Sequence, residues 1–229
     1  MAVKPQLACF ERLGSPGWAA LERVVGAAQD ARLLVVADGK RGDVPTTAAA
    51  YGQALVGSTP TPWGEVEGLG ADAFTTNPLL GSDALEPLIE AAREAGAGVF
   101  ALVRTSNPGA AEFQDTDSNG RPLYERLAEL VASAAPALAA EASPLTGMGA
   151  VVGATAPEHL ARLRELMPNS IFLIPGVGAQ GGRPEDLGPA LVSGEPASIL
   201  VPAARSIAGA ADPAAAAEDL RAALWALGS

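Results

Sequence analysis

The sequence is poor in cysteine, histidine and aromatic residues, and it has no long hydrophobic run. Its 229 residues include one cysteine, Cys9, and one histidine, and aromatic residues make up 4%. One cysteine cannot form a disulfide framework within the chain, so we expect a reducing, cytoplasmic setting without a secretory signal. The apolar runs reach about half a dozen residues, far below the roughly 20 needed to cross a bilayer, so we expect no membrane insertion.

Basic residues are also scarce. The chain carries 15 Lys and Arg against 26 Asp and Glu, which gives a formal net charge of -11. Binding to nucleic acid without sequence preference needs a concentrated basic surface, so we expect no nucleic-acid partner. An anionic ligand would have to meet a local positive site.

The length and the hydrophobic content of 48% suffice for one large core, so we expect a single domain over residues 1–229. Short apolar runs alternate with longer amphipathic stretches, which is typical of βα units around a parallel sheet. The expected strands are Ala2–Cys9, Arg32–Asp38, Ala71–Thr76, Gly98–Arg104, Gly149–Gly153, Ile171–Pro175 and Ser198–Pro202. The expected helices are Gly17–Ala28, Pro45–Val56, Ser82–Ala95, Pro122–Glu141, Pro157–Leu166, Glu185–Val192 and Pro213–Leu227.

The pattern therefore predicts an α/β fold of the (β/α)8 TIM-barrel type, with only seven βα units evident. A closed barrel of this type has eight. The apparent first strand begins directly after Met1, so we expect either an open barrel or a chain that is short at its start.

The most informative segment is Asp38-Gly39-Lys40-Arg41-Gly42-Asp43, which follows the apolar run 33–37. A buried strand thus ends in fixed charges at the place where α/β barrels keep their chemistry. The strand period of two places Asp38 and Lys40 on the same side, where a carboxylate and an ammonium can share one cavity.

Five motifs carry a resemblance to a known family. They are 37–47 with its D-x-K-x-x-D spacing, Val3-Lys4-Pro5-Gln6, Thr105-Ser106-Asn107-Pro108-Gly109, the segment 175–182, and Ala204-Arg205-Ser206-Ile207. In order and spacing they resemble the longer bacterial branch of the orotidine 5'-phosphate decarboxylases. The resemblance covers nearly the whole chain, beginning at the family's second strand. We therefore expect the family's first strand, whose final Asp binds a ribose hydroxyl, to be encoded upstream of Met1.

The resemblance implies a homodimer with shared active sites and a small-molecule substrate, orotidine 5'-phosphate. Lys40, Asp38, Asp43 and Lys4 would form the catalytic network, with Asp43 and Thr47 reaching the neighbouring subunit's site. The substrate-binding residues would be Thr47, Ser106, Pro175, Gly178, Gln180, Ala204 and Arg205. Ser106 would meet the pyrimidine edge, while the glycine-rich segment 175–182, closed by Gln180, and Arg205 would hold the phosphate. No metal or organic cofactor is implied.

Simpler interpretations remain open. Asp38 and Lys40 could form a structural ion pair, Lys4 could be a solvated strand residue, and Ser106 could cap a turn.

A related Mg²⁺-dependent phosphosugar lyase, either a ketogulonate-phosphate decarboxylase or a hexulose-phosphate synthase, would share the D-x-K-x-x-D spacing. A shortened barrel could also have lost its activity.

Overall fold

The computed structural model describes residues 1–178 and 180–228. The chain divides into two compact units at the bond between Ala101 and Leu102. Strand β6 (Gly98–Arg104) runs across this division. The expectation of a single domain stays a prediction.

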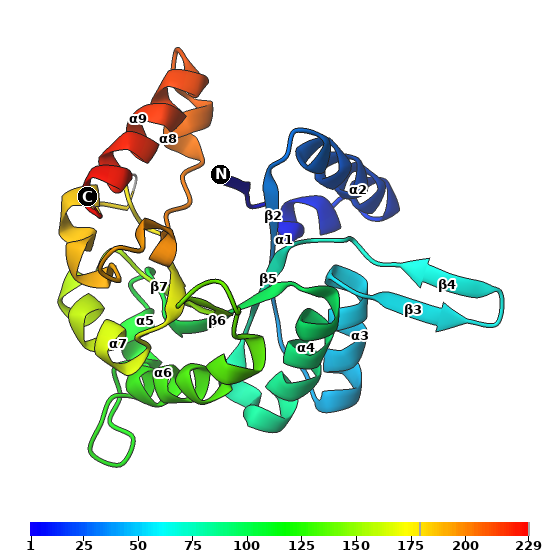
Figure 1. Ribbon diagram of the computed structural model, residues 1–229, viewed down its shortest axis with the longest axis horizontal. Coiled ribbons are helices and arrows are strands. Elements are labelled where there is room, and N and C mark those ends of the chain that lie inside the picture. The colour runs from blue at the N-terminus through cyan, green and yellow to red at the C-terminus, as the bar shows by residue number, and fades with distance from the viewer. Residues whose placement is uncertain (179, 229) are drawn as a thin grey trace. The chain divides into compact units, whose positions relative to one another are not determined.

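Unit 1 contains a parallel sheet whose strand order is β1 (Ala2–Val3), β2 (Leu34–Arg41), β5 (Ala73–Thr76) and β6 (Figure 1). All four residues of β5 are buried, as is the middle of β2. Such continuous burial is typical of parallel strands that are covered on both faces. Residues 35–37 of the apolar run are therefore a core segment of β2, and Asp38 and the charged residues follow it directly.

The helices of unit 1 are α1 (Leu7–Glu11), α2 (Ser15–Asp30), α3 (Pro45–Leu55) and α4 (Ser82–Ala95), with a 3-10 turn at Pro78–Leu80. Helices α3 and α4 pack side by side (Figure 1). They approach closely because Gly52 has no side chain, and a Cβ there would lie 2.6 Å from the Cβ of Ala91. This packing anchors α3, whose first residue, Pro45, lies two residues after Asp43.

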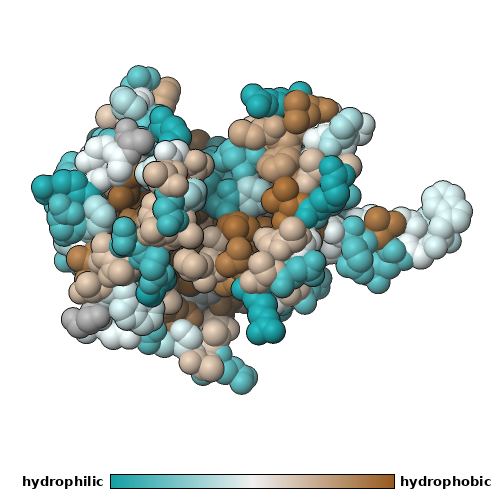
Figure 2. All heavy atoms as spheres, turned by 90° about the horizontal axis from the view of Figure 1, so that it is seen from above, coloured by the Kyte–Doolittle hydropathy of each residue, from teal (hydrophilic) through white to brown (hydrophobic). Residues whose placement is uncertain are grey.

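A hairpin of β3 (Ser58–Thr61) and β4 (Gly64–Glu67) extends from unit 1 between α3 and β5 (Figures 1 and 2). Trp63 in its turn is 93% exposed. The sequence does not predict this hairpin, because its strands are short and largely polar and lack the alternation that marks a half-buried strand.

Unit 2 contains parallel strands β7 (Thr146–Val152), β8 (Ser170–Leu173) and β9 (Ile199–Leu200), and the end of β6 adjoins β7. Its α-helices are α5 (Ala110–Phe113), α6 (Leu123–Ala134), α7 (Leu160–Leu166), α8 (Arg205–Ala208) and α9 (Pro213–Ala226). Its 3-10 segments are Ala135–Leu138, Pro157–His159, Pro184–Ala190 and Pro196–Ser198. Pro213 is the first residue of α9, and Asp212 caps the helix because its side chain accepts the Ala215 N–H at 3.0 Å.

Arg164 ties together the segments that precede β8 and β9. Its guanidinium donates to the carbonyls of Ala190 at 2.6 Å and Ser170 at 2.7 Å, and it stacks 3.8 Å from the ring of Phe172. Burial lowers the pKa of this guanidinium to about 10. Because its partners are carbonyls rather than a carboxylate, we assign Arg164 a structural role at the starts of these strands.

The strand Gly98–Arg104 and the helix Ser82–Ala95 have the bounds that the sequence predicts. The predicted strand Ala2–Cys9 is wrong in its second half, because Leu7–Glu11 forms helix α1. Pro5 has no N–H to continue a ladder, and Leu7 is fully buried in the core. No helix in the described part of the chain has both the length and the apolar character of a membrane span.

Candidate functional site

Asp38 is the centre of a charged cluster in unit 1. Its side chain is 5% exposed, and it receives the ammonium of Lys40 at 2.6 Å on Oδ1 and the ammonium of Lys4 on Oδ2. The Lys40 side chain remains 41% exposed, so its ammonium also faces solvent. A carboxylate held between two cations is thus placed at the end of a buried strand, and Lys40 lies on the same side as Asp38.

Two opposing effects act on the pKa of the Asp38 carboxyl. Burial alone would raise this pKa, because it disfavours the charged form. Hydrogen bonds and charges from Lys4 and Lys40 together outweigh that effect and hold the pKa below its ordinary value. Asp38 is therefore a carboxylate at neutral pH and keeps both ammonium groups in place.

The backbone of β2 is irregular at this point. Between Ala37 and Arg41 the strand advances four positions while its partner β5 advances two, from Phe74 to Thr76. Lys40 lies in this bulge and has a φ of 49°, which is rare for a residue with a side chain. Bulges next to functional sites commonly redirect a side chain, and here the bulge carries Lys40.

Thr75 on β5, which the sequence does not single out as a site residue, supports the bulge. Its hydroxyl accepts the Lys40 backbone N–H at 2.9 Å and donates to Asp38 Oδ1 at 2.9 Å. A threonine in an apolar strand carries no sequence signal that distinguishes this role from ordinary β propensity.

Asp43 and Thr47 lie beyond this cluster, Asp43 just before α3 and Thr47 in its first turn. The Asp43 carboxylate accepts the N–H of Val44 at 2.7 Å, and among the described residues it makes no ion pair with Lys40. The Thr47 side chain is exposed in the first turn of α3. The structure thus brings together Lys4, Asp38 and Lys40, and leaves Asp43 and Thr47 outside their hydrogen bonds.

In unit 2, Ser106 follows β6 and is held by neighbours on both sides in sequence. Arg104, which is 8% exposed, forms a bidentate pair with Asp115 at 2.7 Å and 3.0 Å. The backbone N–H of Thr105 donates to Gln114 Oε1 at 2.8 Å. Helix α5 and the residues after it therefore fix the chain directly before Ser106.

Glycines bring the ends of three strands close to Ser106. A Cβ on Gly153, after β7, would lie 2.7 Å from the Cα of Ser106, and one on Gly176, after β8, would lie 3.2 Å from its Cβ. Gly176 also has a φ of 108°, a region that favours glycine. The Thr155 hydroxyl donates to the Ser106 carbonyl at 2.9 Å, which closes this arrangement.

The glycine-rich segment after β8 forms a compact loop. The Gly182 N–H donates to the Gly176 carbonyl at 3.0 Å, and the Gly178 N–H donates to the Gly182 carbonyl at 2.8 Å. The Gly181 N–H donates to Gly178, so in this conformation these three N–H groups are engaged within the loop. Gln180 is exposed in its turn, and Ala179 lies outside the described residues.

The remaining predicted binding residues occupy the loops that follow β8 and β9. Pro175 accepts the Ala154 N–H at 2.8 Å through its carbonyl, which links the ends of β7 and β8. Ala204 and Arg205 lie at the start of α8 and are exposed. Arg205 forms no ion pair with the residues that the structure describes, so its guanidinium is available to a ligand.

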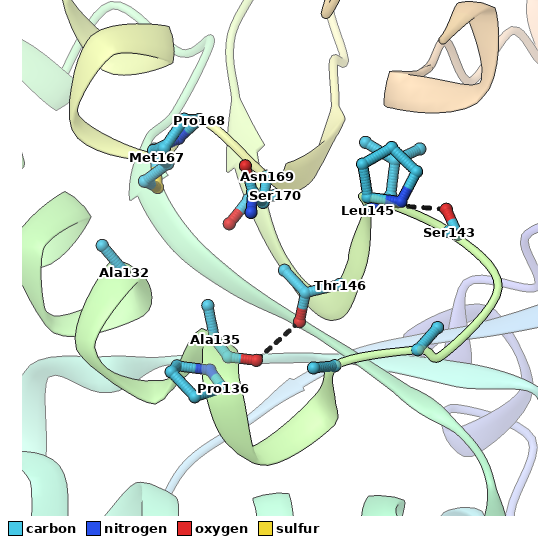
Figure 3. A pocket seen from close by; sticks show the side chains of 13 residues that line it. Ala132, Ala135, Pro136, Ser143, Leu145, Thr146, Met167, Pro168, Asn169 and Ser170 are labelled. Carbon is cyan, nitrogen blue, oxygen red and sulfur yellow. Dashed lines mark hydrogen bonds between the residues drawn. The ribbon is translucent and has the colours of Figure 1, made fainter.

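The cavity in Figure 3 lies at the other end of the unit 2 strands. It has a volume of about 440 Å³ and adjoins Thr146 and Ser170, the first residues of β7 and β8, together with Pro136, Leu145 and Met167. Thr146 turns its hydroxyl to the Ala135 carbonyl at 2.8 Å. Because active sites of α/β barrels lie at the carboxyl ends of the strands, we do not assign this cavity to the candidate site.

Comparisons with known proteins agree with these features. A family model described as "Orotidine 5'-phosphate decarboxylase / HUMPS family" matches residues 1–220. An orotidine 5'-phosphate decarboxylase of Rhodopirellula baltica is 46% identical over 81% of the chain, and one of Deinococcus radiodurans is 45% identical over 84%. The chain spans 60% and 65% of the length of these two relatives.

A solved structure of Leishmania donovani OMP decarboxylase is 36% identical and superimposes with a TM-score of 0.81, covering 99% of this chain and 80% of that one. This match confirms the predicted α/β fold of the TIM-barrel type. The family model covers most of the sequence, and the five motifs lie within the residues it matches. The chain therefore belongs to the orotidine 5'-phosphate decarboxylase / HUMPS family.

Proposed function

We propose that this protein decarboxylates orotidine 5'-phosphate to uridine 5'-phosphate, a step of pyrimidine nucleotide synthesis. The observation that carries the proposal is the buried Asp38 carboxylate held between Lys4 and Lys40 at the end of β2. The similar Rhodopirellula and Deinococcus proteins, which bear the name of this enzyme, support it. The cytoplasmic location stays a prediction from composition.

Lys40 is the group proposed to act on the reacting carbon. Loss of CO₂ from C6 of the pyrimidine leaves a carbanion with little delocalisation into the ring. A fixed positive charge next to that carbon stabilises the carbanion, and the same ammonium can then deliver a proton to it. Its partial exposure leaves Lys40 Nζ able to reach a substrate while Asp38 holds it.

Asp38 is proposed to fix the position of Lys40. Its low pKa keeps it ionised, so the ion pair persists at neutral pH. A misplacement of about 1 Å can cost about a hundredfold in rate, so a fixed ammonium is worth more than a mobile one. The substrate carboxylate would add repulsion, since two like charges about 4 Å apart cost roughly 4 kcal/mol at an effective dielectric near 20.

The remaining assignments are part of the same proposal. Ser106 would bind the pyrimidine edge, and Arg205 with the loop 175–182 would bind the phosphate. Three glycine N–H groups of that loop are engaged internally, so phosphate binding through them requires the loop to rearrange. Gln180 would then close over the phosphate and exclude water.

The direct test is decarboxylation of orotidine 5'-phosphate by the purified chain, followed by the loss of absorbance of the substrate. We expect turnover with EDTA present and none in the Lys40→Ala variant. A requirement for Mg²⁺ together with turnover of a phosphosugar would favour the related lyase. Absence of turnover of either substrate would favour an inactive barrel.

We also propose that the protein acts as a homodimer in which Asp43 and Thr47 complete the partner's site. Their position outside the Asp38 cluster supports this assignment. The test mixes two inactive variants, Lys40→Ala and Asp43→Ala. If sites are shared, a mixed dimer has one intact site, and about a quarter of normal activity should return. No recovery after subunit exchange would contradict shared sites.

A further inference from the structure

We infer that Thr75 is a positioning residue that holds both the Asp38 carboxylate and the Lys40 backbone in their working arrangement. This inference rests on the proposed function. It assigns a role to an uncharged residue of β5 that lies outside the D-x-K-x-x-D segment.

The direction of both hydrogen bonds of Thr75 follows from chemistry. A backbone N–H only donates and a carboxylate only accepts, so the hydroxyl must accept from Lys40 and give its one proton to Asp38. Both donor–acceptor distances are 2.9 Å, and Thr75 is 1% exposed. Water therefore cannot readily replace either bond.

The bulge in β2 explains why a side chain is needed here. Between Ala37 and Arg41, β2 contains two more residues than the paired stretch of β5. The Lys40 N–H therefore has no backbone carbonyl of the regular strand ladder to donate to. Thr75 takes the place of the missing backbone acceptor. Lys40 has a φ of 49°, an unfavourable region for lysine, and such strain persists only where neighbours enforce it.

The same hydroxyl also fixes the Asp38 carboxylate. The charged groups that face this carboxylate are Lys4, from the segment after β1, and Lys40, from its own strand, whereas β5 faces it with the neutral Thr75. Oδ1 receives both Thr75 and Lys40, so the hydroxyl fixes the oxygen that binds the Lys40 ammonium.

The experiment compares three variants of the full chain with the unaltered protein. Thr75→Val removes the hydroxyl at nearly constant volume, and Thr75→Ser restores it. Thr76→Val is the matched control, because Thr76 is buried on the same strand and donates to the Arg41 carbonyl at 2.6 Å without touching Asp38 or Lys40. In the Thr76→Val control the Arg41 carbonyl still accepts a hydrogen bond from the Asn77 N–H, at 2.8 Å, so it is not left without a partner.

We expect Thr75→Val to lower kcat about tenfold to a hundredfold, with KM within about threefold, because the substrate still binds while Lys40 is misplaced. Thr75→Ser and Thr76→Val should stay within about threefold of the unaltered protein in kcat. An unchanged kcat in Thr75→Val would overturn the inference. A loss in Thr75→Ser or Thr76→Val as large as in Thr75→Val would do so too.

A second measurement does not depend on activity. The protonation midpoint of Asp38, followed by ¹³C NMR and assigned with Asp38→Asn, should move to higher pH in Thr75→Val, because the ionised form loses a donor. If the unaltered protein lacks decarboxylase activity but the midpoint moves, the proposed function fails and the positioning role stands. An unmoved midpoint overturns the positioning role by itself.

Discussion

The two units build their candidate residues in opposite ways. In unit 1 the site is made of charges, with Asp38 buried between Lys4 and Lys40. In unit 2 it is made by the absence of side chains, with Gly153 and Gly176 allowing the backbone to close around Ser106. Its ion pair joins Arg104, just before Ser106, to the partly exposed Asp115, which follows Ser106 in sequence, and so supports the chain next to Ser106. Unit 1 should therefore be sensitive to changes of charge, and unit 2 to changes of size.

The largest effect should come from removing the Lys40 ammonium. Lys40→Ala should lower kcat by more than about ten-thousandfold, because it removes the group proposed both to stabilise the carbanion and to donate the proton. Binding of uridine 5'-phosphate, measured by calorimetry, should weaken far less. A variant within tenfold of normal kcat would contradict the assignment of Lys40.

The corresponding change of size in unit 2 is Gly153→Ala. The added methyl would meet the Ser106 backbone at 2.7–2.8 Å, which neither residue can relieve by rotating a side chain. We expect a loss of about 1 to 3 kcal/mol in the free energy of unfolding, and a raised KM because Ser106 moves.

Its control is Gly26→Ala in α2, where a Cβ meets no atom within 4 Å. That change should stabilise the protein by about 0.5 to 1 kcal/mol, since alanine favours the helix. Urea unfolding measures both variants. Equal effects of the two substitutions would show that the close approach at Ser106 is not maintained.

The charged pair of unit 2 should act through stability. Asp115→Ala leaves the nearly buried Arg104 without its carboxylate, while Asp115 itself is 32% exposed. We expect a loss of about 1 to 2 kcal/mol, less than the roughly 3 to 5 kcal/mol of a fully buried pair, because solvent reaches Asp115. Thermal unfolding measures it, with the exposed Glu112→Ala as control, which should change stability by less than about 0.5 kcal/mol.

The smallest effect is the loss of stability that Asp38 contributes when the pH becomes acidic. The folded-state pKa of Asp38 lies below its ordinary value of 3.8, so its contribution to stability is fully present above that value. It is lost as the pH falls through the lower folded-state pKa. The difference in unfolding free energy between the unaltered protein and Asp38→Asn should therefore be constant from pH 7 to about 5 and shrink below 3.8. A difference that grows on acidification would contradict this sign.

Local patterns predicted much of the fold. The helix Ser82–Ala95 has a strong helical apolar period and the strand Gly98–Arg104 is a nearly continuous apolar run, and the structure keeps the bounds of both. Patterns were misleading where the hydrophobic signal was weak, as in the polar β3–β4 hairpin. They were also misleading at Leu7, because a single buried residue fits a strand as well as the helix α1 that forms there. Short apolar runs fit either structure, and the neighbours decide between them.

The sequence by itself determined the residue types of the site, because the D-x-K-x-x-D spacing places acidic and basic groups at the end of a buried strand. Only the tertiary structure decided how those groups are held. The bulge at Lys40 and the hydroxyl of Thr75 come from the pairing of β2 with β5, which joins residues 35 positions apart. Such pairing depends on packing across the sheet, and no pattern within either strand contains it.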